Sequence, residues 1–190
     1  MKLPIIAYGD PVLKKKGVEI DEDYPELTSL VENMFETMYA AKGVGLAAPQ
    51  IGLAIRLFIV DASPFAEDEE PELENFKKVF INPILIEETG DKWVFNEGCL
   101  SIPDVREDVN RHQTIRINYL DEHFEEHEEV YSGLAARIIQ HEYDHIEGKL
   151  FTDKLSPLKK AMIKNKLDSI AKGQVRVDYK MKFSVSKKRP

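Results

Sequence analysis

The sequence contains one cysteine, Cys99, and this scarcity excludes a disulfide-stapled scaffold. A lone cysteine is consistent with a reducing compartment, where thiols stay reduced. Long apolar runs are also lacking, and none approaches the roughly 20 residues that cross a bilayer as a helix. The apolar run within residues 1–6 is too short for a secretory signal, and acidic residues follow it rather than the basic residues of a transit peptide. We therefore expect a soluble cytoplasmic protein with no membrane partner.

Basic residues are in deficit, with 26 against 34 acidic residues and a formal net charge of -8. This balance argues against generic nucleic-acid binding through the whole surface, so we expect no DNA partner. Only the stretch 172–190 departs from it, with seven basic residues and one acid, Asp178. A length of 190 residues suits one compact core. We assign residues 1–172 to a single domain and residues 173–190 to a basic tail, which is either flexible or adds a strand at 175–181.

Histidines are few, but two of the five lie four residues apart in the segment 141–145, His-Glu-Tyr-Asp-His. This spacing is just over one helical turn and places both imidazoles on one face of a helix. There His141 and His145 can bind one divalent metal, with Glu142 placed to move protons. The alternative is a helix whose two histidines are ordinary polar residues.

The residues around the motif favour inward-facing imidazoles. Leu134 and Ile138 precede the histidines on the same helical stripe, which continues an apolar face. Arg137 and Asp144 are expected on the opposite side, facing water. The helix is expected to begin after Ser132, as the N-cap, and to stop near Gly148.

The sequence after the motif offers few candidates for a third ligand, because no Glu or His follows Glu147. Asp153 and Asp168 are the remaining downstream candidates. Upstream, Cys99 lies in the segment 97–101, Glu-Gly-Cys-Leu-Ser, directly after a strand-like run. It is either a small buried core residue or a ligand. In the second case the ligand set is Cys99, His141 and His145, with water in the fourth position.

The apolar periodicity predicts an amphipathic helix over 25–41 and, before the metal helix, five strand-like runs. The strand-like runs are 55–61, 79–88, 92–95, 114–119 and 126–131. Long strands followed by helices favour an α+β fold, with mainly antiparallel sheets packed around a central helix that carries the metal motif. The glycine-rich loop 43–50 lacks the Lys-Ser/Thr ending of a phosphate-binding loop. The acidic segment 61–78 reads as a solvated loop with no assigned chemistry.

Three separated segments resemble the signature motifs of peptide deformylases, in the family's order. They are Gly-Val-Gly-Leu-Ala-Ala-Pro-Gln at 43–50, Glu-Gly-Cys-Leu-Ser at 97–101 and Gln-His-Glu-Tyr-Asp-His at 140–145. The resemblance runs from about residue 10 to the predicted helix around 158–170. It implies that residues 1–172 form a deformylase-like catalytic domain. The implied reaction is hydrolysis of the formyl group from the N-terminal formyl-methionine of new polypeptides, with release of formate.

The resemblance also implies roles for individual residues. Glu142 would accept a proton from water and pass it to the leaving amine, while the Gln50 side chain and the Leu100 backbone N–H would stabilise the oxyanion. Gly45 would let the substrate backbone pair beside it. The remaining substrate-binding residues implied are Val44, Leu134 and Ile138 for the methionine side chain and Arg106 near the exit path. Glu97 and Arg111 are expected to form an ion pair that steadies the cysteine loop.

The implied cofactor is one divalent metal ion per chain, with Fe2+ as the expected native metal and Zn2+, Ni2+ or Co2+ as alternatives. The implied partners are formyl-methionyl nascent peptides, bound by a monomer. The basic tail suggests docking on ribosomal RNA. Two rival functions stay open at this level. One is a zinc endopeptidase that uses the same His-Glu-x-x-His motif, and the other is a non-enzymatic module in which the metal only holds the fold.

Overall fold

The computed structural model describes residues 1–66 and 70–184. Within these ranges the chain forms three α-helices, seven strands and several short 3₁₀ turns. The helices are α1 (Leu27–Ala40), α2 (Gly133–Ile146) and α3 (Pro157–Ala171). The strands are β1 (Ile5–Ile6), β2 (Gly45–Ala47), β3 (Leu57–Asp61), β4 (Lys77–Cys99), β5 (Ile102–Leu120), β6 (Glu126–Ser132) and β7 (Met181–Lys182).

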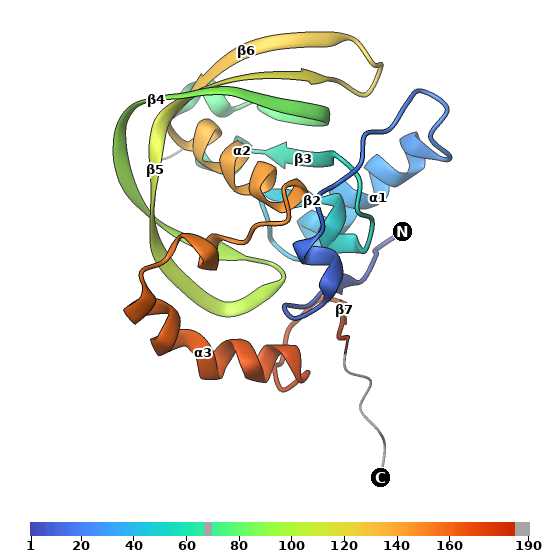
Figure 1. Cartoon of the computed structure of the whole chain (residues 1–190). Coiled ribbons are helices and arrows are strands. Elements are labelled where there is room, and N and C mark those ends of the chain that lie inside the picture. Colours follow the sequence, from blue (N-terminus) through green and yellow to red (C-terminus); the bar gives the residue numbers. More distant parts are fainter. Residues whose placement is uncertain (67–69, 185–190) are drawn as a thin grey trace.

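Five of the strands form one antiparallel sheet in the order β2-β3-β4-β5-β6. The long strands β4 and β5 curve strongly, so that the sheet wraps around a helix (Figure 1). Their pairing shifts register at several points, such as between Thr89 and Lys92. Such bulges bend a strand and increase its twist. They explain how one hairpin can cover more than one side of the helix.

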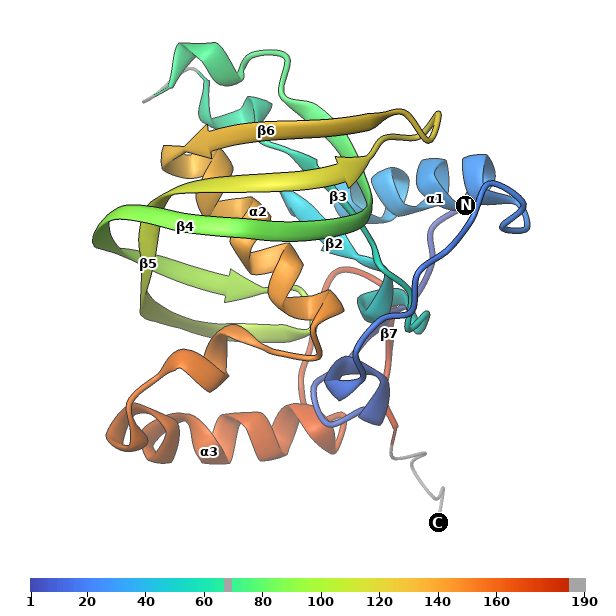
Figure 2. The same ribbon diagram turned by 45° about the horizontal axis from the view of Figure 1, so that its top comes forward.

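Helix α2 lies in the concavity of this sheet, which confirms the predicted α+β fold with a central helix (Figures 1 and 2). Its apolar residues, such as Ile139, join β3, β4 and β5 residues in one hydrophobic cluster. Because the sheet encloses the helix, 11 of its 14 residues are buried. The helix begins after Ser132 and is followed by Gly148 in the left-handed region, as predicted. However, the Ser132 side chain does not cap it, and the Glu70 carboxylate accepts from the Leu134 N–H at 2.9 Å instead.

The expectation that Arg137 and Asp144 face water was wrong. Arg137 is 2% exposed and Asp144 is 8% exposed. A helix enclosed by a curved sheet has no wide solvent face, so its polar residues must find partners inside the protein. Arg137 donates to Glu97, and Asp144 accepts from Arg111 at 2.7 Å.

The other predicted elements are found with shifted ends. The helix predicted at 25–41 is α1, which covers the outer side of β2 and β3 with a second hydrophobic cluster. The two strand-like runs 79–88 and 92–95 are a single strand, β4, with Gly90 in the left-handed region between them. Glycine adopts that conformation without steric cost, so the pairing with β5 continues across it.

The segment after α3 folds back along the start of the chain. β7 pairs in parallel with β1, and the two form a separate small sheet (Figure 2). Residues 185–190 of the basic tail and residues 67–69 of the acidic segment lie outside the described residues. The described flanks of the acidic segment contain the 3₁₀ turns Ser63–Phe65 and Pro71–Leu73. None of the described helices combines the length and apolarity needed to span a membrane.

Candidate metal centre

The ligand atoms of Cys99, His141 and His145 come together where the β4–β5 turn faces helix α2. All three atoms lie within 4.8 Å of one another. The Cys99 Sγ is 3.4 Å from the His145 Nε2, and the two imidazole rings have centroids 5.1 Å apart. The sulfur comes from the last residue of β4, while the nitrogens come from successive turns of α2. One thiolate and two imidazoles are a donor set suited to a soft or borderline divalent metal.

A buried ionic cluster holds the His141 ring from behind. The ring Nδ1 lies 2.9 Å from Glu97 Oε2, so its proton is assigned to that nitrogen and Nε2 faces the ligand group. Glu97 also accepts from Arg111 Nε at 2.7 Å and from Arg137 Nη1 at 2.9 Å. The predicted Glu97–Arg111 ion pair is therefore confirmed, and Arg137 adds a second cation to the same carboxylate.

The charges of this cluster follow from its contacts. Burial raises the pKa of Glu97, but hydrogen bonds from His141 and Arg111 outweigh it and hold that pKa well below its usual range. Burial lowers the pKa of His141, but hydrogen bonds to Cys99 and Glu97 outweigh it and raise that pKa to about 10. Burial lowers the pKa of His145 well below its ordinary value, which leaves that ring neutral at pH 7. A metal bound at His141 must therefore displace a proton.

Glu142 lies beside the ligand group with one oxygen unpaired. It is 4% exposed, and its Oε2 has no hydrogen-bond partner within the described part of the chain. Burial raises its pKa to about 7. The neighbouring strand β2 leaves room for it only because residue 45 is glycine, since a Cβ at Gly45 would lie 2.4 Å from the Glu142 Oε1. A carboxyl group with this pKa can both accept and release a proton near neutral pH.

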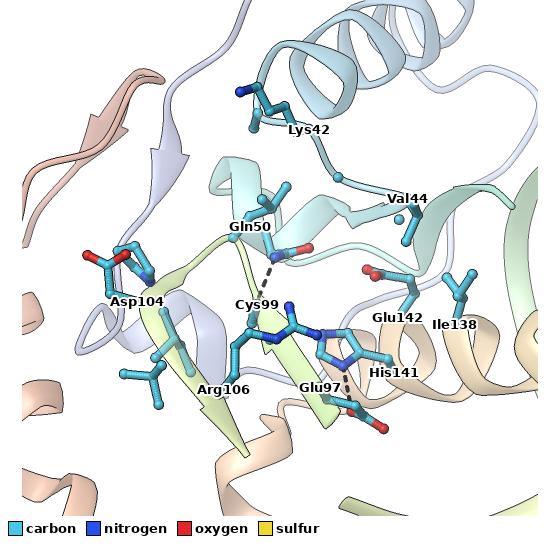
Figure 3. Close-up of a pocket in the computed structure, with 18 of the residues that line it drawn as sticks. Lys42, Val44, Gln50, Glu97, Cys99, Asp104, Arg106, Ile138, His141 and Glu142 are labelled. Atoms are coloured by element: carbon cyan, nitrogen blue, oxygen red, sulfur yellow. Dashed lines mark hydrogen bonds and ion pairs between the residues drawn. The ribbon is translucent and has the colours of Figure 1, made fainter. Parts of the chain in front are cut away.

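The Gln50 amide is oriented by its own loop. Its Oε1 accepts from the Ala47 N–H at 2.8 Å, which directs the Nε2 towards Cys99 Sγ and Ser101 Oγ, each at 3.4 Å. Figure 3 shows the amide facing Cys99. The side chain thus caps its loop with the oxygen and offers donors to the site with the nitrogen. Leu100 lies in the two-residue turn between Cys99 and Ile102 and lines the same cavity as Gln50.

A cavity of about 640 Å³ opens in front of these groups. Its wall includes nearly all of the residues proposed from sequence. They are Val44, Gly45, Gln50, Cys99, Leu100, Arg106, Leu134, Ile138, His141 and Glu142. Figure 3 shows Val44 and Ile138 near the Glu142 carboxylate, with Lys42 and Asp104 farther out in the same pocket. His145 does not line the cavity and lies 1% exposed behind it.

Asp121, Glu125 and His127 form a second group with metal-ligand atoms within 4.8 Å. The Asp121 carboxylate already accepts from the backbone N–H groups of His123 and Glu125 and lies 2.7 Å from the His127 Nε2. These contacts stabilise a turn between β5 and β6. We therefore assign this group to the turn.

Sequence reasoning missed several residues that support the site. Arg137 precedes His141 by four residues, so the two side chains lie on the same face of α2 and both reach Glu97. This spacing could have predicted from sequence that Arg137 shares a partner with His141. Asp144 and Tyr179 gave no such signal. Asp144 is connected to the site through Arg111, and Tyr179 reaches the Leu100 carbonyl from 79 residues away in the sequence.

Comparisons with known proteins agree with this geometry. A family model described as polypeptide deformylase matches residues 2–161. The peptide deformylase of Christiangramia forsetii is 63% identical, covering 99% of this chain and 99% of that protein. That of Flavobacterium johnsoniae is 56% identical with the same coverage of both chains. A crystal structure of a peptide deformylase from Legionella pneumophila has a TM-score of 0.79 and 37% identity, covering 93% of this chain and 99% of the other. The chain therefore belongs to the peptide deformylase family, metal-dependent hydrolases that remove the N-formyl group from the N-terminal methionine of newly made polypeptides.

Proposed function

We propose that this chain uses one divalent metal ion for deformylation and that Cys99, His141 and His145 would hold it. The observation that supports it is the convergence of one sulfur and two ring nitrogens within 4.8 Å at the edge of a cavity. The Glu97 carboxylate fixes one ring from behind, which is the usual support of a metal-binding histidine. When bound, such an ion lowers the pKa of a coordinated water and polarises a carbonyl group. We propose Fe2+ as the native metal, with Zn2+, Ni2+ or Co2+ as substitutes.

Glu142 is the proposed proton carrier. Its unpaired Oε2, its burial and its raised pKa suit a group that takes a proton from the attacking water and later gives it to the departing amine. The absence of a side chain at Gly45 leaves the space that the Glu142 carboxylate occupies.

Gln50 and Leu100 are the proposed donors to the oxyanion that forms when water adds to the formyl carbonyl. The Gln50 Nε2 is held towards the site by the bond between Ala47 and the amide oxygen. The Leu100 backbone N–H lies next to the sulfur ligand in the chain. Removing one donor of this kind typically costs about 3 to 4 kcal/mol of barrier.

The cavity wall suggests how the substrate lies. Val44, Leu134 and Ile138 supply apolar surface for the methionine side chain. Gly45 leaves its backbone open for pairing with the substrate chain. Arg106 lies at the cavity wall, anchored to Asn96 through its Nε at 2.9 Å, and is the proposed contact for the following residues of the peptide.

The decisive experiment compares a formyl-methionyl peptide with an unformylated peptide that carries internal bonds. We expect formate from the first and no cleavage of the second. The zinc endopeptidase alternative is not supported, because the relatives named above are peptide deformylases. Cleavage of only the unformylated peptide would overturn the assignment. Elemental analysis of anaerobically purified protein identifies the metal.

Glu142→Gln separates an enzyme from a metal-stapled scaffold. The amide keeps the shape of the side chain but cannot carry the proton, so we expect a folded, metal-loaded protein with little formate release. The exposed Glu128→Gln is the matched control and should keep full activity. Full activity of Glu142→Gln would remove this residue from the mechanism.

Four further features are proposed for the protein in the cell. We propose that it acts as a monomer, in the cytoplasm, on formylated nascent peptides. We also propose that the basic residues of 173–190 contact ribosomal RNA, since they contrast with the acidic balance of the whole chain.

A further inference from the structure

The two-residue turn that joins β4 to β5 is held at both of its carbonyl groups. Cys99 ends β4, Ile102 begins β5, and Leu100 and Ser101 lie between them. The Tyr179 hydroxyl donates to the Leu100 carbonyl at 2.7 Å. The backbone N–H of Tyr8 donates to the Ser101 carbonyl at 2.8 Å. Each donor comes from a segment far from the turn in the sequence.

The two segments that hold the turn are themselves paired. Ile5 lies opposite Met181 in the small parallel sheet of β1 and β7. The Ile5 N–H donates to the Lys180 carbonyl at 2.8 Å, directly after Tyr179. Figure 1 shows this red segment beside the blue start of the chain. The Tyr179 side chain is therefore supported by a backbone that is fixed one residue away.

The same segment also forms part of the cavity wall. Residues 176–179 line the cavity together with Leu100, Pro103 and Asp104. They lie after residue 161, where the match to the family model ends. Part of the cavity wall is therefore formed by residues outside the region that the family model matches.

We infer that Tyr179 is a positioning residue for deformylation, which fixes the turn that presents the Leu100 N–H and the Cys99 sulfur to the cavity. The inference rests on the proposed role of Leu100. The bond from Tyr179 fixes the planar peptide group that joins residues 100 and 101, and the Leu100 N–H lies in the adjacent peptide plane, separated from it only by the φ and ψ of Leu100. Donors that are already aimed at the developing charge need no reorganisation during the reaction. A turn released at its carbonyl group would lose part of this alignment.

The test is Tyr179→Phe, which removes only the hydroxyl. We expect kcat for formate release from a formyl-methionyl peptide to fall on the order of tenfold, with KM within about twofold of wild type. Melting temperature and metal content should match those of wild type. Amide hydrogen exchange in the peptide that covers residues 99–102 should become faster, because the turn opens more often.

The matched control is Tyr119→Phe, at the opposite end of β5. It also removes a tyrosine hydroxyl, which donates to Glu129 at 2.6 Å, but it does not touch the turn. This variant should keep the kcat of wild type and the same exchange at 99–102. An equal loss of kcat in both variants would overturn the inference.

Three other results would overturn it as well. They are an unchanged kcat in Tyr179→Phe, a fall that follows a loss of metal or of folding, and unchanged exchange at 99–102. The wild-type assay distinguishes these from a failure of the proposed function. If wild type releases formate and Glu142→Gln does not, the function stands whatever Tyr179→Phe shows.

Discussion

Single residues in this protein carry several contacts at once. Glu97 is hydrogen-bonded to Arg111, Arg137 and His141. It therefore links β4, β5 and α2 at one buried carboxylate. Its charge is balanced by more than one cation, which explains why its pKa stays low despite burial. The pairing of Glu97 with Arg111 was expected from the sequence analysis, but only the enclosed position of α2 reveals the contribution of Arg137.

Cys99→Ala tests the ligand set at the residue scale. The variant should lose most of its metal, because two imidazoles without the thiolate hold a divalent ion weakly. Elemental analysis after anaerobic purification measures this. Ser101→Ala, in the same turn, should keep one metal ion per chain. A Cys99→Ala protein with full metal content would contradict the proposed ligand set.

Gly45→Ala tests the space beside Glu142. The new Cβ would lie 2.4 Å from the Glu142 Oε1, so either the carboxylate or β2 must move. Displacement of a reacting group by about 1 Å can lower kcat about a hundredfold, and we expect a loss of that order with metal content unchanged. Gly43→Ala is the control, because its Cβ would meet the flexible end of Leu100. Kinetics of formate release for the two variants should therefore differ, and equal losses would contradict the explanation.

At the scale of elements, α2 depends on partners outside itself. The alternation of apolar residues predicted the strands, and the spacing of Leu134, Ile138 and His141 predicted the helix. The pattern did not predict how completely the sheet encloses α2, because the curvature of the sheet depends on bulges within β4 and β5. The helix cap was missed because its acceptor comes from a residue 64 positions earlier in the chain. Glu70 comes from the acidic segment for which no role was predicted.

Glu70→Ala tests this cap. The carboxylate accepts from the Leu134 N–H at the start of α2, where the helix dipole also favours negative charge. Loss of such a cap costs about 1 kcal/mol. Urea unfolding should show a decrease of that size in the free energy of unfolding. Glu72→Ala, in the same segment, should stay within the error of wild type, and an equal loss in both variants would argue against a capping role.

Asp61, at the end of β3, gives a pH-dependent prediction. Burial raises its pKa, but hydrogen bonds from Ser63 and Tyr39 outweigh it and hold the pKa below 3.8. The stabilisation is therefore present above the unfolded-state pKa and is lost as pH falls through the folded-state value. Asp61→Asn should be less stable than wild type at neutral pH. The difference in free energy of unfolding, measured with urea, should narrow below about pH 4.

The exposed Asp23→Asn is the control for this series. Its free energy of unfolding should follow that of wild type at each pH. A gap between wild type and Asp61→Asn that persists unchanged into acid would show that the aspartate charge is not what stabilises the end of β3.

At the scale of the whole molecule, the family and the reaction could be predicted because three short motifs resemble the signatures of peptide deformylases, in the family's order. The three proposed metal ligands lie close together, and the proposed substrate-binding residues line the adjacent cavity. Tyr179 could not be predicted, since its contact with Leu100 spans 79 positions and follows no local period. Contacts of that kind depend on how β1 and β7 pair, which depends in turn on the complete fold.

Reversing the charge of the basic tail tests the proposed docking on ribosomes. Lys187, Lys188 and Arg189 carry part of the basic charge of the tail. Reversing all three to Glu should weaken co-sedimentation with ribosomes at low salt, because fewer phosphates are neutralised. Formate release from a free formyl-methionyl peptide should stay unchanged. Co-sedimentation equal to that of wild type would end the docking proposal.

The ionic cluster around Glu97 also limits which substitutions the protein can tolerate. Arg111 and Arg137 are each at most 4% exposed, so neither can find water if the carboxylate is lost. An uncompensated buried charge costs several kcal/mol, which is a large part of the stability of a domain this size. Arg111 would keep the Asp144 carboxylate as a partner, whereas Arg137 would keep only the backbone carbonyls of Val109 and Trp93. An apolar replacement at position 97 would therefore be tolerated only together with a change at Arg137. A variant that carries only the change at position 97 would be much less stable than the present chain.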